Sequence, residues 1–526
     1  MPRGSDAGQR EARPGSARRK ARDSLASVAA EGLGRLIPRQ ELLDLAREFG
    51  LQPQIVEKDY ALGWLLAGLG QHPATRDTWL FKGGTCLKKC YFETYRFSED
   101  LDFTLLDAAH LNEAFLRGLF QEVAEWVYEQ TGVEMPADAR RIEVFDNGRG
   151  GRSAEGRIGY RGPVARAGDA PRIKLDLTDH ERVVLPAVRR PIHHPYSDRL
   201  AGGMQVTTYA FEEVFAEKMR ALAERLRPRD LYDVIHLYRR TELEPDRQSL
   251  MQALREKCAF KGIALPTLVS LRQSPLLAEL RAAWNDMLAH QLPQLPPFES
   301  FWDELPAVFA WLTGDRGRAV LPALAVAGAG ELDIVWRPPA MATSWRAYGA
   351  RAPLEIVRFA AANRLCVELD YTDERGRRSS RIIEPYSLRR TSAGDLLLMA
   401  VKADTGEGRS YRVDRIQGAT ATNRTFIPRY GVELTSGGFM VALPVVRQPA
   451  AESNRPQPRQ VSSLPRSPTK ALPARAASTG PHHTFRCTVC GKQFRKSTYD
   501  AALNPHKGKN GYPCYGTVGT FVKTTY

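Results

Sequence analysis

Two aspartates separated by a single residue, Asp100 and Asp102, are the side chains of this sequence best suited to chemistry. Alternate residues of a β-strand point to the same side, so a strand here would hold both carboxylates on one face and direct Leu101 and Phe103 into a core. Two anions held side by side repel each other unless a cation lies between them. Carboxylate oxygens are ligands that Mg²⁺ binds. The pair therefore predicts a magnesium site.

A glycine-rich turn precedes the two aspartates. Gly83, Gly84 and Thr85 follow an apolar segment that ends at Lys82, and they open a short predicted helix. The first N–H groups of a helix have no partner within it and can bind phosphate. Paired acids alone are more often solvent-facing or hairpin residues. The turn favours the catalytic interpretation, because a phosphate site joined to a metal site is what a nucleotide-transferring enzyme needs.

Two further residues are candidates for this site. Asp176, in the alternating run Arg-Ile-Lys-Leu-Asp-Leu, is the candidate third carboxylate. An equally good interpretation makes it a strand-edge acid paired with Lys174. Lys218 lies on a predicted helix, with Arg225 on nearly the same face. It either extends to solvent or reaches a triphosphate and offsets the charge that grows during transfer.

Strands and helices must position these residues. Period-two alternation predicts strands at 79–82, 101–106, 142–145, 157–160 and 172–177. Helical spacing of apolar residues predicts helices at 38–69, 110–131, 208–225, 229–238 and across 244–314. Pro228 separates two of these helices.

The length of 526 residues is too great for one core, and 43% hydrophobic with 26% charged residues is typical of a soluble globular protein. We predict a disordered basic arm (1–30), a first domain (35–315), a linker (316–349), a second domain (350–445), a disordered linker (446–482) and a Cys/His module (483–526).

The net charge of +15 indicates a polyanionic partner, most simply nucleic acid, unless much of the excess lies in disordered tails. No apolar run is long enough to span a membrane. The basic, polar N-terminus lacks the apolar region of a signal peptide. Seven cysteines in this length do not form a disulfide framework. We therefore expect a cytoplasmic protein without a membrane partner.

The C-terminal module carries a Cys-x-x-Cys pair, Cys487 and Cys490, followed by His506 and Cys514. Three cysteines and one histidine are a common structural zinc set. So short a segment cannot bury a sufficient core, so bound Zn²⁺ would supply folding free energy. The alternatives are a redox pair or a degenerate finger. Basic and aromatic residues around the four positions favour contact with nucleic acid.

The motifs of the first domain resemble those of the AbiEii/AbiGii toxin family, nucleotidyltransferases of the polymerase-β-like superfamily. The resemblance covers about residues 40–300, and its matching segments are Lys82–Thr85, Arg96–Ser98, Asp100–Phe103, Tyr160–Pro163, Lys174–Asp176 and Glu213–Asp233. It implies transfer of a nucleotide from an NTP to an acceptor, either tRNA or a protein hydroxyl. Family members are toxins of bacterial toxin–antitoxin or phage-defence systems, so a separate antitoxin protein is implied.

Carried over to this sequence, the resemblance assigns roles. The implied catalytic residues are Asp100, Asp102, Lys218 and Asp230. The implied nucleotide-binding residues are Lys82, Gly83, Gly84, Thr85, Arg96 and Ser98. The two strand aspartates would hold Mg²⁺, with Asp176 as a third ligand, and Lys218 would bind the triphosphate. Asp230 would lie near the acceptor or support the site.

The second domain resembles the WYL domain through Ile383–Leu388, Gly408–Arg412 and Asp414–Ile416. WYL domains are Sm-like small β-barrels that look like ligand sensors in bacterial regulators. The pattern implies a ligand face of Tyr386, Arg409, Tyr411, Arg412 and Arg415. Arginine side chains suit phosphate ligands. The alternative is a basic sheet face whose arginines pair with nearby acids.

The fold expected is therefore of the α+β class. A polymerase-β-like nucleotidyltransferase core with a helical C-terminal part precedes a small WYL-like barrel and a small zinc-binding module. The expected function is that of a toxin-type, NTP- and Mg²⁺-dependent nucleotidyltransferase acting on RNA or protein. The alternative is a catalytically inactive regulator that binds nucleic acid, RNA or DNA, through the WYL-like and zinc modules.

Overall fold

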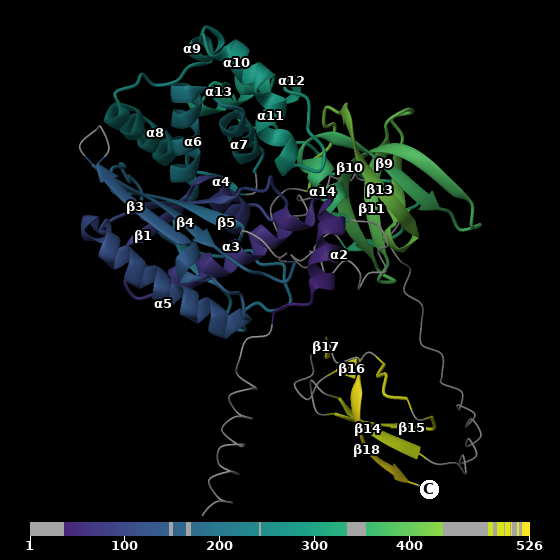
Figure 1. Ribbon diagram of the computed structural model, residues 1–526. Helices are drawn as coiled ribbons and strands as arrows, with labels where there is room; N and C mark the ends of the chain where they lie inside the picture. The colour runs from purple at the N-terminus through teal and green to yellow at the C-terminus, as the bar shows by residue number, and fades with distance from the viewer. Residues whose placement is uncertain are drawn as a thin grey trace, which may run out of the picture. The chain divides into compact units, whose positions relative to one another are not determined.

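The computed structural model forms two compact units, residues 1–448 and 449–526, which are described separately (Figure 1). In the first unit the structure describes residues 36–146, 151–164, 170–240, 243–333 and 354–434. In the second it describes residues 482–487, 492–498, 500–504, 506–507, 513–514 and 518–525. The predicted arm at 1–30 and the linker at 446–482, apart from its last residue, lie outside the described residues, as do residues 334–349 of the predicted linker at 316–349.

A mixed seven-stranded sheet forms the centre of the first unit, in the order β3-β4-β5-β2-β1-β7-β6. Its strands are β1 (Trp79–Lys82), β2 (Asp100–Leu105), β3 (Arg140–Asp146), β4 (Arg152–Gly159), β5 (Arg172–Thr178), β6 (Val188–Pro191) and β7 (Gln205–Thr208). β2 pairs with β1 antiparallel and with β5 parallel. Leu101 and Phe103 are buried, as alternation predicts, and this frees the intervening acids for the opposite face.

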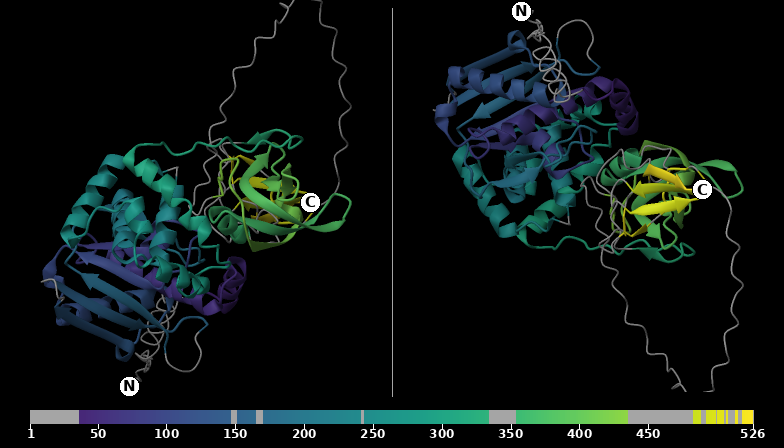
Figure 2. Two further views of the ribbon diagram at one scale, coloured as in Figure 1. Left: turned by 90° about the horizontal axis from the view of Figure 1, so that it is seen from above. Right: turned by 90° about the horizontal axis from the view of Figure 1, so that it is seen from below.

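Helices pack around this sheet. α2 (Arg39–Phe49) packs on α3 (Pro53–Gln71), and α3 and α5 (Glu113–Thr131) pack together against the strands. A second group of helices lies on the side of the sheet opposite α3 and α5 (Figure 1 and Figure 2). Its helices are α6 (Phe211–Arg225), α7 (Pro228–Arg239), α8 (Arg247–Lys261), α9 (Leu268–Arg272), α10 (Leu277–Ala282), α11 (Trp284–Leu288), α12 (Glu299–Trp302) and α13 (Leu305–Thr313). Pro228 is the first residue of α7, where its missing N–H costs nothing.

A second sheet follows α14 (Leu354–Ala362). Its strands are β8 (Leu332–Asp333), β9 (Leu365–Thr372), β10 (Arg378–Thr391), β11 (Leu396–Lys402), β12 (Gly408–Arg412) and β13 (Ile416–Thr425). They pair in the order β12-β11-β10-β9-β13, with β8 on β10.

The prediction of a closed barrel is wrong for the strands that the structure describes, because β12 and β13 do not pair with each other. The long strand β10 pairs with β9 through its first half and with β11 through its second, and its register shifts between Pro385 and Ser387. A bulge of this kind bends a strand. The bend curves the sheet, but each edge strand keeps one partner.

In the second unit, β14 (His482–Cys487) pairs with β15 (Gln493–Lys496) and β18 (Gly519–Thr525), and β16 (His506–Lys507) pairs with β17 (Pro513–Cys514). Phe485, Cys487 and Leu503 form a small core. Within the described residues of both units, no helix combines the length and the apolar character that a membrane crossing requires.

Candidate active site

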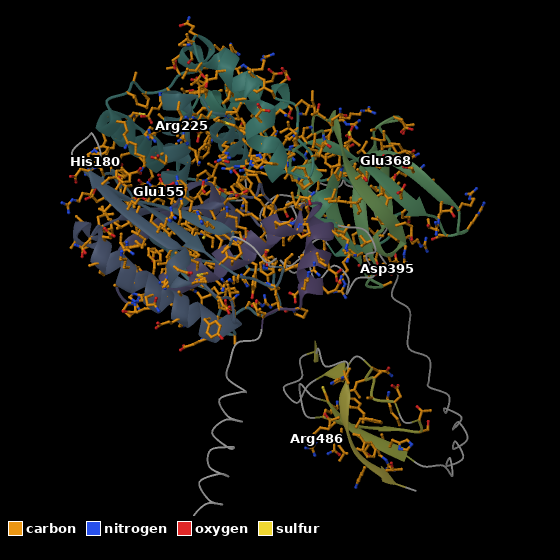
Figure 3. The ribbon with its side chains drawn as sticks, viewed as in Figure 1. Glu155, His180, Arg225, Glu368, Asp395 and Arg486 are labelled. Atoms are coloured by element: carbon orange, nitrogen blue, oxygen red, sulfur yellow. The ribbon has the colours of Figure 1, made fainter. Side chains whose placement is uncertain are left out.

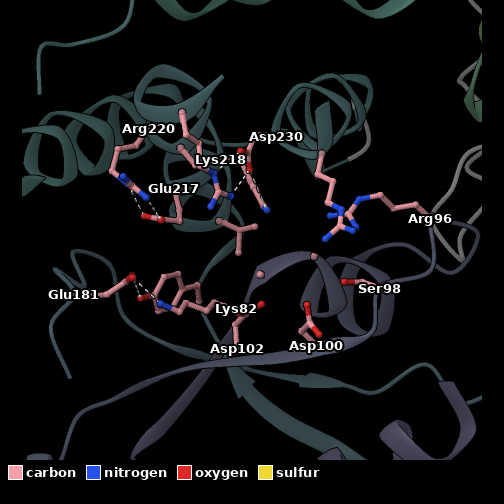
Figure 4. Close-up of a pocket in the computed structure, with 17 residues that line it drawn as sticks. Lys82, Arg96, Ser98, Asp100, Asp102, Glu181, Glu217, Lys218, Arg220 and Asp230 are labelled. Carbon is pink, nitrogen blue, oxygen red and sulfur yellow. Dashed lines mark hydrogen bonds and ion pairs between the residues drawn. The ribbon is translucent and has the colours of Figure 1, made fainter. Parts of the chain in front are cut away.

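A cavity of about 310 Å³ lies between β2 and helices α6 and α7 (Figure 4). Charged side chains dominate its wall, which is formed by Lys82, Gly83, Gly84, Arg96, Ser98, Asp100, Asp102, Glu181, Tyr209, Val214, Glu217, Lys218, Arg220, Ala221, Arg225, Arg229 and Asp230. The residues singled out in the sequence at 82–84, 96, 98, 100, 102, 218 and 230 therefore surround one space.

Asp100 and Asp102 point from β2 into the cavity, toward the helices that carry Lys218 and Asp230 (Figure 4). Neither aspartate forms an ion pair within the described part of the chain. Burial raises the pKa of Asp102 to about 6, with Lys82 opposing and Asp176 adding to the shift. Burial also raises the pKa of Asp100, although Lys174 opposes it. Two carboxylates with raised pKa values and no cation partner form a site that favours an added cation.

The glycine turn forms the floor of the cavity beside these acids. Gly83 begins the short helix α4 (Gly83–Cys86) with a φ of 80°, a backbone conformation that favours glycine. Gly84 lies against the Arg96 guanidinium, since a β-carbon there would be 2.3 Å from Nη2. Thr85 is buried, and its hydroxyl donates to the carbonyl of Asp100. Its predicted contact with phosphate stays a prediction, because this side chain is directed at β2.

Lys218 is not a surface lysine. Its side chain is 10% exposed, and Nζ lies 2.8 Å from Oδ2 of Asp233 and 3.7 Å from Oδ1 of Asp230. Asp230 is fully buried and accepts two hydrogen bonds from Arg225, at 2.7 and 2.8 Å. The face of α6 that carries Lys218 and Arg225 thus binds acidic residues of α7. Both side chains also line the cavity.

Asp233 is a residue that sequence reasoning did not single out, and it connects several others. It is fully buried and accepts hydrogen bonds from the hydroxyl of Tyr95, at 2.5 Å, and from Arg96, at 2.8 and 2.9 Å. Burial alone would raise the pKa of Asp233, but the charges of Arg96 and Lys218 outweigh burial and hold it well below its usual range. Arg96 also donates from Nη1 to Gln291, at 3.1 Å, so each of its three guanidinium nitrogens donates to a protein group.

Asp176 is paired with Lys174, at 3.0 Å, and does not line the cavity. It does lie beside Asp102 in the pairing of β5 with β2. The carboxylates that do line the cavity beyond the predicted ones are Glu181 and Glu217. Glu181 lies 2.7 Å from Nζ of Lys82. It follows β5 by three residues, and its position just after a strand that neighbours β2 was the available signal.

Arg229 differs from the other basic residues that line the cavity in its contacts. Lys82, Arg96, Lys218, Arg220 and Arg225 each pair with a carboxylate. Arg229 does not, within the described ranges; its Nε lies 3.5 Å from the carbonyl oxygen of Met287. A cation without an anionic partner beside a cavity is suited to an anionic ligand.

The ligand face implied for the second domain is not assembled as an exposed surface. Tyr386 and Tyr411 are buried. The arginines pair with acids: Arg409 with Glu407, Arg412 with Asp395 and Asp414, and Arg415 with Glu374. Asp395 is marked in Figure 3. This arrangement is the ion-paired basic face considered as the alternative, and ligand binding by these residues stays a prediction.

No three His, Cys, Asp or Glu side chains are grouped to hold a metal ion among the residues that the structure describes. Cys490 lies outside those residues, as does the side chain of Cys514. Cys487 is buried, and His506 pairs in register with Cys514. The zinc site therefore stays a prediction.

Comparison with known families separates the chain into two parts. Residues 64–310 match the family model described as "Nucleotidyl transferase AbiEii toxin, Type IV TA system", and residues 353–421 match that of the WYL domain. The chain contains an AbiEii nucleotidyltransferase domain and a WYL domain. Every residue that lines the cavity belongs to the AbiEii domain, whereas α14 and β9 to β12 belong to the WYL domain.

A search of curated proteins gives no match. Among solved structures, the chain is similar to MenT4, a nucleotidyltransferase toxin from Mycobacterium tuberculosis H37Rv, at 19% identity and a TM-score of 0.34, over 53% of this chain and 90% of that one. It is also similar to the proteasome accessory factor B/C of Arthrobacter aurescens, at 18% identity and a TM-score of 0.14, over 41% of this chain and 32% of that one. At these scores neither likeness assigns a role to a residue.

Proposed function

We propose that the AbiEii domain transfers a nucleotide from an NTP to an acceptor hydroxyl. The observation that carries this proposal is that Asp100 and Asp102 line the same cavity as Gly83, Gly84 and Lys218. An acidic pair, a glycine turn and a buried lysine around one space supply a cation site, room for phosphates and positive charge for a leaving group.

The residues present fit Mg²⁺. This ion is often held by one or two carboxylates together with phosphate oxygens of the substrate, and Asp100 and Asp102 offer two carboxylates. Bound there, Mg²⁺ would neutralise phosphate charge and favour attack by the acceptor oxygen.

The rest of the work falls to the chain itself. Gly83 and Gly84 line the cavity, and their lack of side chains lets Asp102 and Arg96 lie close to the backbone there. Arg229 offers a guanidinium for a phosphate oxygen. Lys218, oriented by Asp233, offsets the negative charge that grows on the departing pyrophosphate. In this in-line displacement the acceptor oxygen bonds to the α-phosphorus as the bond to pyrophosphate breaks. Positioning and charge stabilisation dominate such reactions.

The acceptor we propose is an RNA end, tRNA foremost, or a protein hydroxyl, and the setting is a bacterial toxin–antitoxin or phage-defence system. The family description names a type IV toxin–antitoxin system, so a separate antitoxin is the expected protein partner and the cytoplasm the expected site of action. The net charge of +15 supports a nucleic-acid acceptor over a neutral one.

The test is a labelling reaction of the full chain with each α-labelled NTP, Mg²⁺, total RNA and a protein extract. We expect label on RNA or protein. Asp102→Asn should lower the rate by on the order of a hundredfold or more. Asp138→Asn, a matched change of an exposed aspartate, should not change it.

Absence of label with every NTP and acceptor would reject the proposal and favour the alternative, a regulator that binds nucleic acid without turnover. That alternative predicts equal binding of RNA or DNA by the wild type and Asp102→Asn.

A further inference from the structure

Helix α14 of the WYL domain makes buried polar contacts with the AbiEii domain. Glu355, 5% exposed, accepts a hydrogen bond from the hydroxyl of Thr94. Arg358, 3% exposed, lies 3.0 Å from Glu355 and 3.5 Å from Oε2 of Glu93. The Thr94–Glu355 and Glu93–Arg358 contacts join residues more than 260 positions apart in the sequence. Buried charge pairs of this kind are costly to break from one side, so they fix the elements that carry them.

The residues next to Glu93 and Thr94 contact an ion-pair partner of Lys218, and one of them, Arg96, lines the active-site cavity. Tyr95 and Arg96 both donate to Asp233, and the other oxygen of Asp233 lies 2.8 Å from Nζ of Lys218. The segment 93–96 therefore contacts α14 with its first two side chains and the partner of Lys218 with its last two.

Helix α7 gives a second connection. Asp230, in its first turn, lines the cavity, and Asp233, about one turn further on, is ion-paired with Lys218. Near its other end, Nε2 of His236 lies 3.3 Å from Oδ1 of Asn363, and Arg239 donates to the carbonyl of Ala362, at 2.9 Å. Ala362 is the last residue of α14, and Asn363 follows it directly. The acids that orient Lys218 are thus held to α14 through both the 93–96 segment and α7.

We propose that Glu355 is a positioning residue of the transferase site, although it lies in the WYL domain. It fixes the 93–96 segment, which fixes Asp233 and so holds Lys218 at the cavity. α14 also packs on β9, β10 and β13 (Figure 1), so a displacement of the WYL sheet is passed to the same lysine. The structural part of this inference stands without the proposed function; only its kinetic readout rests on nucleotidyl transfer.

The experiment compares the wild type with Glu355→Gln and, as a milder second variant, Thr94→Val, which removes the hydrogen bond with little change of shape. The control is Glu368→Gln, a change of an exposed acid on β9 that accepts a hydrogen bond from Ser380. The first readout is the rate at which an amine-reactive reagent labels Lys218, followed by mass spectrometry across a range of pH. Lys174, whose side chain is 40% exposed, serves as an internal reference.

We expect Lys218 to be labelled at least about threefold faster in both variants, because loosening its surroundings raises the open population. Lys174 should keep its rate, and the control should match the wild type. In the transfer assay, kcat/KM should fall by about tenfold, since small misplacements of positioning groups reduce rate strongly.

Unchanged labelling of Lys218 in both variants, at every pH, would overturn the inference. If the wild type transfers no nucleotide, the proposed function fails, but the labelling result still decides whether Glu355 positions Lys218.

Discussion

The backbone of Gly83 lies directly against the carboxylate of Asp102: a β-carbon at Gly83 would be 2.0 Å from Oδ2. Gly83 directly follows β1, whose last residue, Lys82, is the partner of Asp102 in the β1–β2 register. Any side chain at this glycine would push the aspartate out of place, and the φ of 80° adds backbone strain.

Gly83→Ala should therefore lower nucleotide transfer by on the order of a hundredfold, because it displaces a group at the reacting centre. Stability should fall by only about 1–2 kcal/mol, the cost of the left-handed conformation. The measurements are the labelling rate and a denaturation curve. Gly118→Ala is the control, because Gly118 lies exposed on α5 with nothing within 4 Å of a new β-carbon; it should stabilise the protein by roughly 0.5–1 kcal/mol. Wild-type activity in Gly83→Ala would contradict the geometry.

Arg229 should bind substrate phosphate. Arg229→Gln is expected to weaken binding of an NTP by about tenfold or more, as the loss of a charge-assisted hydrogen bond implies, with little change in stability. Arg225→Gln should do the reverse: it leaves the buried carboxylate of Asp230 without its bidentate partner, so the loss appears in the free energy of unfolding. Calorimetric titration with a non-hydrolysable NTP and denaturation of both variants separate the two. Equal NTP affinity in Arg229→Gln and wild type would refute the assignment.

Asp233 should be a large contributor to stability. Asp233→Asn keeps the shape but removes the charge that Arg96 and Lys218 share, which leaves Arg96 without its anion and Lys218 with only the more distant Asp230. We expect a loss of about 3–5 kcal/mol, typical of breaking a buried ion pair from one side. Chemical denaturation measures it. Asp138→Asn, on an exposed turn, should change the free energy of unfolding by less than about 0.5 kcal/mol.

The contact with α14 should depend on pH through Glu93. Burial raises the pKa of Glu93 to about 7, and Glu355 adds to the shift while Arg358 and Lys88 oppose it. Between pH 4.5 and 7 the unfolded chain has lost this proton whereas the folded chain retains it, so stability falls as pH rises through that window. Across the whole window the free energy of unfolding should fall by roughly 3 kcal/mol. Glu93→Gln should match the wild type near pH 5 and exceed its stability at pH 8. If the difference in unfolding free energy between Glu93→Gln and the wild type does not change with pH, the pKa of Glu93 is not raised.

The C-terminal unit should contain zinc. Metal analysis of the purified full chain is expected to give one Zn²⁺, lost in Cys487→Ser, because the thiolate set supplies much of the folding free energy of so small a unit. A chelator should abolish its unfolding transition and leave that of the larger unit in place. Cys258→Ser, in α8, is the control. Purified protein without stoichiometric zinc would exclude the site.

The local sequence pattern was sufficient to predict the parts of the site that lie on a single strand or a single turn. The alternation at 100–103 predicted which side chains of β2 are buried, and the glycine turn was placed correctly beside them. Pattern failed for β6 and β7, whose four residues each are too few to show a period, and Thr208 was predicted to start a helix.

Long-range pairings were beyond the reach of sequence reasoning. Arg96 and Asp233 are 137 residues apart, and nothing local distinguishes an arginine that binds a buried aspartate from one that binds phosphate. Asp176 differs, because its pairing with Lys174 is local and was considered from the sequence. Glu181, not Asp176, lines the cavity. The barrel was predicted from the family, and the bend at Pro385 gives a curved sheet that stays open among the described strands.

The buried ion-paired contact between α14 and the 93–96 segment has an evolutionary consequence. Glu355 and Arg358 of α14 contact Thr94 and Glu93 of the AbiEii domain. A recombination event that replaced everything after residue 353 would therefore leave Glu93 and Thr94 without these buried partners. The AbiEii and WYL domains of this chain should consequently be inherited together, and their contact residues should change as a set across lineages.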